Sequence, residues 1–268
     1  MLNYNVIDLF TILTMKKFLV SLLKLFNQSS FERILNFLSR IHLSKQLQRK
    51  TNFASVISSN TNSANIENYF INLVLKSLRF AFNNKIKNFN RKLKHTKLFN
   101  IFPGEHYRLL NAIAKIRKPK VIVEIGTFTG MSAFAFFKNH KGVIYSFDLK
   151  SYKSFQNHID KNVEKRFIQF LVDLSKFINF KKYQNILNKA DIIFLDAPKD
   201  GFFEYKLIKF LTKLKKKKKK ILIIDDIKFY NMLNLWDKIE SPKIDLTSLS
   251  HWSGTGIVDI SETLKIKK

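Results

Sequence analysis

The sequence predicts an α/β protein with a doubly wound, mostly parallel sheet, a late antiparallel strand and a helical N-terminal extension. Two observations carry this prediction. From about Pro103 onward, short apolar runs of strand length alternate with segments of helical periodicity, which is typical of a parallel sheet covered on both faces. In addition, most of the strand-like runs end in acidic residues, and open parallel sheets bind ligands beyond the carboxyl ends of their strands.

The first hundred residues are expected to form a helical extension, separate from the sheet domain at 101–268. Apolar residues recur three or four apart in 18–41 and again in 66–82. Between these segments, 51–65 is rich in Ser, Asn and Thr and shows no periodicity, so we interpret it as a linker. The boundary between the two parts is placed near residue 100.

The sheet domain opens with a helix predicted over 104–117. Five strands are predicted to follow, at 121–125, 143–147, 167–172, 191–195 and 221–224. A helix over 231–239 comes next, and two late strands, the last within 256–260, are expected to close the sheet.

The composition excludes several classes of site. The chain has no cysteine, so disulfides, thiolate zinc sites and cysteine nucleophiles are absent. No apolar run reaches the length that crosses a bilayer, because Lys16, Lys17 and Lys24 interrupt the N-terminal candidate. The start of the chain is also a poor secretory signal. We therefore expect a protein of the cytoplasm or an organelle interior, with peripheral membrane contact by the N-terminal helices as an alternative.

The formal net charge of +28 has two interpretations. It suits nucleic acid or an anionic membrane as a partner. It also follows from composition, since lysine supplies 40 of the 48 basic residues, whereas bidentate phosphate binding favours arginine. We favour the compositional interpretation. The run of six lysines at 215–220 is expected to form a solvated turn, because mutual repulsion would keep it exposed.

A glycine turn follows the first predicted strand. Gly126 and Gly130 are separated by three residues, and Glu124 precedes the first glycine by two. This spacing differs from the G-x-G-x-x-G turn that presses against a pyrophosphate. A helix that begins after such a turn directs free backbone N–H groups and its positive dipole end at a ligand above the strand.

Acidic residues stand at the ends of the second and third predicted strands. Asp148 comes 22 residues after Gly126, at the position where an acid in nucleotide-binding sheets accepts hydrogen bonds from ribose hydroxyls. Asp173 is expected beside an adenine. A single aspartate at a strand end can equally be a helix cap or a turn residue. Because Asp148 and Asp173 are predicted at the same edge of the sheet as the glycine turn, we favour a nucleotide-like ligand for both.

The fourth and fifth predicted strands end in a denser group of charges. Asp196 is followed three residues later by Lys199, and Asp225 and Asp226 are adjacent. If the two strands are neighbours, three carboxylates converge, which is costly unless a cation neutralises them. Carboxylate oxygens suit a hard ion such as Mg²⁺. A helix N-cap is the alternative role for Asp225 and Asp226.

The segment from about Pro103 to the end resembles the class I S-adenosylmethionine (SAM)-dependent O-methyltransferases of the catechol O-methyltransferase type. The matching pieces are Val-Glu-Ile-Gly-Thr-Phe-Thr-Gly130, Tyr-Ser-Phe-Asp148, Asp-Ile-Ile-Phe-Leu-Asp196 with Lys199, and Leu-Ile-Ile-Asp-Asp226. The resemblance implies a Rossmann-like fold and SAM as cofactor. The cofactor residues it implies are Glu124, Gly126, Thr127, Gly130, Ser132, Asp148 and Asp173.

The same resemblance implies a metal site and a reaction. Asp196, Asp225 and Asp226 take the positions of the ligands for a divalent ion, although Asp226 stands where the family usually has asparagine. Lys199 takes the position of the general base, and we expect its pKa to be depressed by a neighbouring cation and by partial burial. The function expected is methyl transfer from SAM to a hydroxyl oxygen of a small-molecule acceptor, with Asp196 and Lys199 as catalytic residues and Mg²⁺ assisting.

Two other functions remain open from the residues. An RNA methyltransferase would suit the basic charge. Asp196-Ala-Pro-Lys199 lacks the aromatic residue that stacks a flipped base, which argues against methylation of base amines but leaves ribose and other RNA targets open. A non-catalytic binding module is the second alternative. Trp252 is expected either over the acceptor pocket or in packing, and His251 is expected to be structural.

Overall fold

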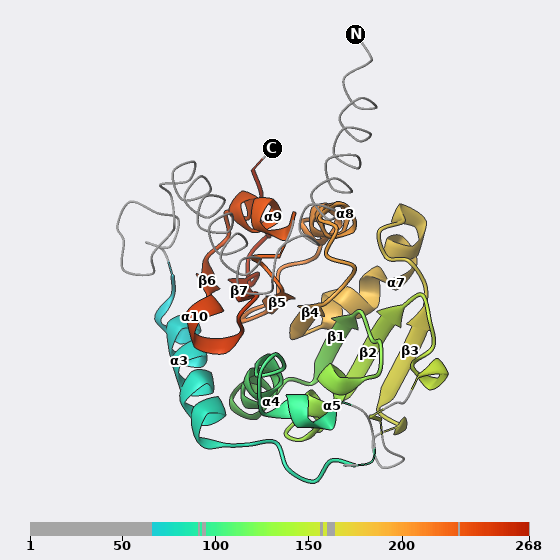
Figure 1. Ribbon diagram of the computed structural model, residues 1–268. Helices are drawn as coiled ribbons and strands as arrows, with labels where there is room; N and C mark the ends of the chain where they lie inside the picture. The colour runs from blue at the N-terminus through green and yellow to red at the C-terminus, as the bar shows by residue number, and fades with distance from the viewer. Residues whose placement is uncertain are drawn as a thin grey trace, which may run out of the picture. The chain divides into compact units, whose positions relative to one another are not determined.

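A seven-stranded sheet runs through the part of the chain that the structure describes, in the order β3-β2-β1-β4-β5-β7-β6 (Figure 1). The strands are β1 (Val121–Ile125), β2 (Val143–Asp148), β3 (Phe167–Leu171), β4 (Ile192–Leu195), β5 (Ile221–Asp225), β6 (Lys243–Asp245) and β7 (Thr255–Asp259). Strands β1 to β5 are parallel, whereas β7 pairs antiparallel with β5 and with β6. The predicted mostly parallel sheet with a late antiparallel strand is confirmed.

This computed structural model describes residues 66–267 except 91, 93–94, 156–157, 160–163 and 230. The described residues belong to one compact unit, 54–268. The helical segment predicted within 18–41 and the linker predicted at 51–65 lie outside the described residues.

Helices cover both faces of the sheet (Figure 1). The helices and 3-10 turns are α3 (Asn68–Asn83), η2 (Thr96–Phe99), α4 (His106–Arg117), α5 (Met131–Phe137), η3 (Tyr152–Ser154), α7 (Phe177–Lys189), α8 (Phe202–Leu211), α9 (Met232–Lys238) and α10 (Thr247–Ser250). Helices α3, α4 and α5 lie on one face, and α7, α8 and α9 lie on the other. The fold is therefore the doubly wound, Rossmann-like one that the alternation of strands and helices predicts.

Alternation along the strands divides the interior into two cores. Ile122 and Phe194 point to the face that carries α4 and α5, whereas their neighbours Val123 and Leu195 point to the face that carries α7 and α8. Successive side chains in a strand point to opposite faces, so a strand covered on both sides must be apolar at nearly every position. This is why the central strands could be predicted from the sequence as short, largely apolar runs, with the buried Glu124 of β1 as an exception.

Helix α3 packs against α4 on the first of these faces. Phe70 and Leu73 belong to the same buried cluster as Leu109 and Leu110 of α4. The hydroxyl of Tyr69 also donates a hydrogen bond to the Asp259 carboxylate at the end of β7. Thus α3, which precedes residue 100, contributes to the core of the sheet domain, and the domain boundary near residue 100 stays a prediction.

The lysine run before β5 differs from the prediction at its last residue. Lys215, Lys216, Lys218 and Lys219 are exposed, but Lys220 is only 1% exposed, and its Nζ donates a 2.6 Å hydrogen bond to the Leu187 carbonyl. The expectation that the whole run forms a solvated turn is therefore wrong. Lys220 immediately precedes β5, and its ammonium supplies a second donor to a carbonyl in the last turn of α7, which also accepts the N–H of Ala190 at 3.3 Å.

No helix within the described residues is both long and apolar enough to cross a membrane.

Because Lys220 is buried, its positive charge lowers the stability of the folded protein, and this effect depends on pH. Burial lowers its pKa from 10.5 to about 8, which corresponds to roughly 3 kcal/mol. Between these pH values the unfolded state binds more protons than the folded state, so stability rises with pH. We expect a smaller rise in Lys220→Met than in the unmodified chain, because Lys243, whose pKa burial also lowers to about 8, still contributes; urea unfolding at pH 7.5 and 10 would measure it. Exposed Lys218→Met is the matched control and should follow the unmodified chain; an identical rise in Lys220→Met would contradict the assignment.

Candidate active site

The glycine turn after β1 is built around a close approach of two backbones. Gly126 has φ +97°, and a Cβ on it would lie 1.8 Å from the carbonyl oxygen of Asp196, at the end of β4. Its N–H donates to the carbonyl of Phe147 in β2 at 2.8 Å. Gly130 has φ +80° and precedes α5. Only glycine fits the first position, because a side chain would separate β1 from β4.

Asp148 ties this turn to the end of β2. One carboxylate oxygen accepts the N–H groups of Thr127 and Phe128 at 2.7 and 3.0 Å, and the other accepts those of Leu149 and Lys150 at 2.6 and 3.1 Å. Burial acts to raise the pKa of Asp148, but these four donors outweigh it and lower the pKa below its usual value. The carboxylate is therefore charged and held in a fixed position.

Glu124 lies beneath the turn. Its carboxylate is fully buried and accepts hydrogen bonds from the hydroxyls of Ser132 and Ser146. Burial is the main cause that raises its pKa to about 8; the two hydroxyls oppose the shift, and the charges of Asp196 and Asp148 add to it. In the described structure Glu124 supports the turn from behind.

A cavity of about 640 Å³ opens over the carboxyl ends of β1, β4 and β5. Of the residues predicted to bind the cofactor, Gly126, Thr127, Ser132, Asp148 and Asp173 line it. Glu124 and Gly130 do not line it. The Asp173 carboxylate also accepts the N–H of Ser175 at 2.8 Å, so it caps the turn that leads into α7.

Lys199 bridges two of the predicted metal ligands. Its Nζ lies 2.8 Å from Asp196 Oδ1 and 2.5 Å from Asp226 Oδ2. Burial acts to lower the pKa of Lys199, but the two carboxylates outweigh it and hold the pKa above its usual value. The expected depression of the Lys199 pKa requires a bound cation, so it stays a prediction; in the described structure the neighbours of the ammonium are the two carboxylates.

The three predicted metal ligands do converge. One carboxylate oxygen from each of Asp196, Asp225 and Asp226 lies within 4.8 Å of the others. Burial raises the pKa of Asp225 well above its usual value, and the charges of Asp196 and Asp226 act in the same direction. Burial would also raise the pKa of Asp226, but hydrogen bonds from His251 and Lys199 outweigh it and hold that pKa low.

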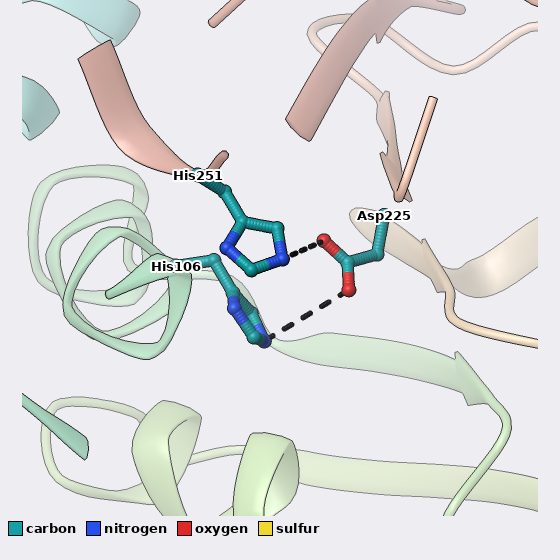
Figure 2. Close-up of side chains that lie close together, drawn as sticks. All are labelled: His106, Asp225 and His251. Atoms are coloured by element: carbon teal, nitrogen blue, oxygen red, sulfur yellow. Dashed lines mark ion pairs between the residues drawn. The ribbon is translucent and has the colours of Figure 1, made fainter. Parts of the chain in front are cut away.

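Two histidines that the sequence did not single out as functional stand beside this group (Figure 2). His106 begins α4, and His251 follows α10; both line the cavity. His106 Nε2 lies 4.0 Å from Asp225 Oδ2, and His251 Nε2 lies 3.9 Å from Asp225 Oδ1 and 3.4 Å from Asp226 Oδ1. Neither position carries a spacing signal, since a helix start and a late loop meet β5 only through the fold.

Aromatic side chains form the outer wall of the cavity. Trp252 lines it and is 54% exposed, with ring centroids 5.9 Å from Phe102 and 6.4 Å from Phe229. Of the two expectations for Trp252, the structure favours a place at the cavity over interior packing.

Comparison with known proteins assigns the chain. Residues 81–249, more than half of the sequence, match the O-methyltransferase family. The chain belongs to the O-methyltransferase family. It is a SAM-dependent methyltransferase, as the motifs at Gly126, Asp148, Asp196 and Asp226 predicted, and the alternative of a non-catalytic module is set aside.

Solved methyltransferases are similar to this O-methyltransferase at low identity. A Podospora anserina methyltransferase bound to S-adenosylhomocysteine is 15% identical, with a TM-score of 0.44, over 81% of this chain and 100% of that one. A putative caffeoyl-CoA O-methyltransferase from Staphylococcus aureus is 15% identical, with a TM-score of 0.43, over 85% of this chain and 99% of that one. A Geobacter sulfurreducens methyltransferase is 14% identical, with a TM-score of 0.42, over 84% of this chain and 96% of that one. No curated protein matches the sequence.

Because Gly126 lies so close to the backbone of Asp196, we expect the methyl group of an alanine at this position to weaken SAM binding strongly. Gly126→Ala should weaken SAM binding by roughly tenfold or more, because a left-handed alanine costs about 1–2 kcal/mol before the clash with Asp196 is counted. Titration calorimetry with SAM would measure it.

Gly142→Ala is the matched control. A Cβ there would meet the Lys120 carbonyl at 1.9 Å, a similar clash just before β2, at the opposite edge of the sheet from the cavity. It should lower the melting temperature and leave SAM affinity within about twofold at low temperature. Equal loss of affinity in both variants would show that the effect is global.

Proposed function

We propose that this O-methyltransferase transfers the methyl group of SAM to a hydroxyl oxygen of a small-molecule acceptor, assisted by a divalent ion at Asp196, Asp225 and Asp226. The observation that supports this most is the shared cavity. The glycine turn after β1 and the charged group after β4 and β5 line the same space of about 640 Å³. A donor and an acceptor bound there would lie next to one another.

The donor half of the cavity fits SAM. Thr127, Ser132 and Asp148 line the cavity at the turn, and Asp173 lies at the end of β3. Asp148 is charged, and we propose that it faces the ribose hydroxyls. SAM, when bound, supplies a methyl carbon that its sulfonium activates toward in-line attack by oxygen.

The acceptor half fits a divalent cation. Three carboxylates meet within 4.8 Å, and Lys199 supplies one positive charge against them. Formally two negative charges are left, which a divalent ion such as Mg²⁺ would balance with oxygen ligands of the kind it prefers. When bound, such an ion holds a hydroxyl oxygen and lowers its pKa.

Lys199 is proposed to receive the hydroxyl proton at Nζ. Its ion pairs with Asp196 and Asp226 hold it as an ammonium in the described structure, so it can act as a base only when both carboxylates are engaged by another cation. The backbone fixes where the amine stands. Lys199 has φ +67°, and its N–H donates to buried Glu204 at 2.7 Å. Asp196 is proposed to orient both the amine and the acceptor.

Removal of divalent ions tests the metal. Methyl transfer from labelled SAM to a panel of catechols, phenols and aliphatic alcohols should fall by at least about 100-fold in chelator, on the scale of losing one electrostatic stabiliser. Added Mg²⁺ should restore it. Asp196→Asn should lose the Mg²⁺ response, whereas Asp200→Asn, in the following loop, should keep it. Full activity in chelator would contradict metal assistance, and turnover on RNA with none on the panel would contradict the small-molecule acceptor.

Trp252 tests the acceptor wall. We expect Trp252→Ala to raise the KM for the acceptor by roughly tenfold, while the KM for SAM changes by less than about twofold, because Trp252 follows His251, which lies beside Asp225 and Asp226. Trp252→Phe should keep most of the acceptor affinity. Parallel changes in both KM values would contradict this placement.

A further inference from the structure

A second cluster of ligand-type side chains lies beside the acidic group. His106, Asp225 and His251 come from three separate elements, and both imidazoles point toward the Asp225 carboxylate (Figure 2). The two Nε2 atoms lie 4.0 and 3.9 Å from its two oxygens. One nitrogen or oxygen from each residue lies within 4.8 Å of the others. The cluster is thus the size of a metal coordination sphere, although no two of these atoms are at hydrogen-bond distance.

Burial makes this arrangement unusual. His106, Asp225 and His251 are 6%, 3% and 5% exposed. Neither ring nitrogen of His106, nor Nδ1 of His251, has a hydrogen-bond partner among the described residues. A buried polar atom without a partner costs about 1–3 kcal/mol, so the unpaired Nε2 of His106, which faces Asp225, indicates a ligand that pairs with it.

Charge points to a cation. Lys199 neutralises Asp196 and Asp226, but within the described part of the chain it makes no ion pair with Asp225. Among the described residues, the Thr255 hydroxyl donates a long hydrogen bond of 3.4 Å to the Asp225 carboxylate. The buried Asp225 carboxylate therefore faces two imidazoles instead of an ammonium, and a bound cation would supply the missing charge.

The ligand types select the class of cation. Imidazole nitrogens suit Zn²⁺ and similar first-row ions, whereas Mg²⁺ prefers oxygen alone. Ligand atoms about 2.0–2.1 Å from a tetrahedral ion are about 3.3 Å apart, so the present 3.9–4.0 Å would have to contract by well under 1 Å. Rotation of the side chains is enough for such a shift.

A carboxylate stands behind one of the imidazoles. His251 Nδ1 lies 3.9 Å from Glu105 Oε2, and both atoms are buried without a hydrogen-bond partner among the described residues. Histidines that bind metals commonly donate their other N–H to a carboxylate, which sets the tautomer and the ring orientation. Glu105 is in place to do this when Nε2 is bound to an ion.

We propose that His106, Asp225 and His251 bind one divalent transition-metal ion, of the type that imidazole prefers, at the floor of the acceptor half of the cavity. Three protein ligands leave an open position for water or an acceptor oxygen, as in catalytic zinc sites. This site shares Asp225 with the proposed Mg²⁺ site but does not depend on methyl transfer.

Cobalt provides a direct readout. The full chain is stripped with chelator and titrated with Co²⁺, and the visible d–d absorption and the metal content are followed. We expect one Co²⁺ with an absorption typical of low coordination number, displaced by Zn²⁺ and unaffected by millimolar Mg²⁺. His106→Gln and His251→Gln should each weaken binding by about 100-fold, and Glu105→Gln by about tenfold.

Asp196→Asn is the matched control, because Asp196 belongs to the acidic group alone and should leave Co²⁺ binding within about twofold. Co²⁺ that binds the two histidine variants as tightly as the unmodified chain, or that is lost in Asp196→Asn, would place the ion in the acidic group and overturn the proposal. No Co²⁺ binding by a chain that still binds SAM would also overturn it. SAM titration and methyl transfer on the same preparations report the proposed function separately.

Discussion

The contact between Gly126 and the backbone of Asp196 organises the candidate active site. Without a side chain at Gly126, the turn after β1 can lie directly against the end of β4. The turn proposed to face the donor and the residues proposed to face the acceptor are therefore neighbours through the backbone, with no flexible side chain between them. Methyl transfer needs in-line alignment of oxygen, carbon and sulfur, so rigidity at this contact bears directly on the chemistry.

The charges around the cavity depend on that backbone arrangement. Lys199 reaches both Asp196 and Asp226 because β4 and β5 are adjacent parallel strands whose carboxyl ends meet at one edge. The acidic residues there experience different environments. Four N–H donors hold Asp148 charged, whereas burial favours the protonated forms of Glu124 and Asp225. One edge of the sheet thus holds carboxylates that differ in charge state, and a bound cation would change that balance.

Features that depend on neighbouring residues could be predicted from the sequence, whereas features that depend on contacts between distant segments could not. The central strands are readable because burial on both faces requires apolar residues at nearly every position. The positions of Asp148 and Asp196 beside the cavity could be predicted because each residue stands at the end of a strand, and the carboxyl ends of parallel strands lie at the same edge of the sheet. The burial of Lys220 could not be predicted because it depends on a carbonyl of α7, which is distant in sequence. The second ion pair of Lys199 depends on Asp226 at the end of the neighbouring strand, so it too required the tertiary structure.

The sequence by itself determined the fold class, through the alternation of strands and helices, and the glycine turn, through the spacing of two glycines. Its motifs also carried the family resemblance that implied SAM as the donor. Only the tertiary structure decided which groups meet Asp225. His106 begins α4 and His251 follows α10, and neither is close to β5 in sequence. Their convergence is a consequence of packing α4 and the late loop over the sheet edge, and such contacts between distant segments leave no periodic or spacing signal in a single sequence.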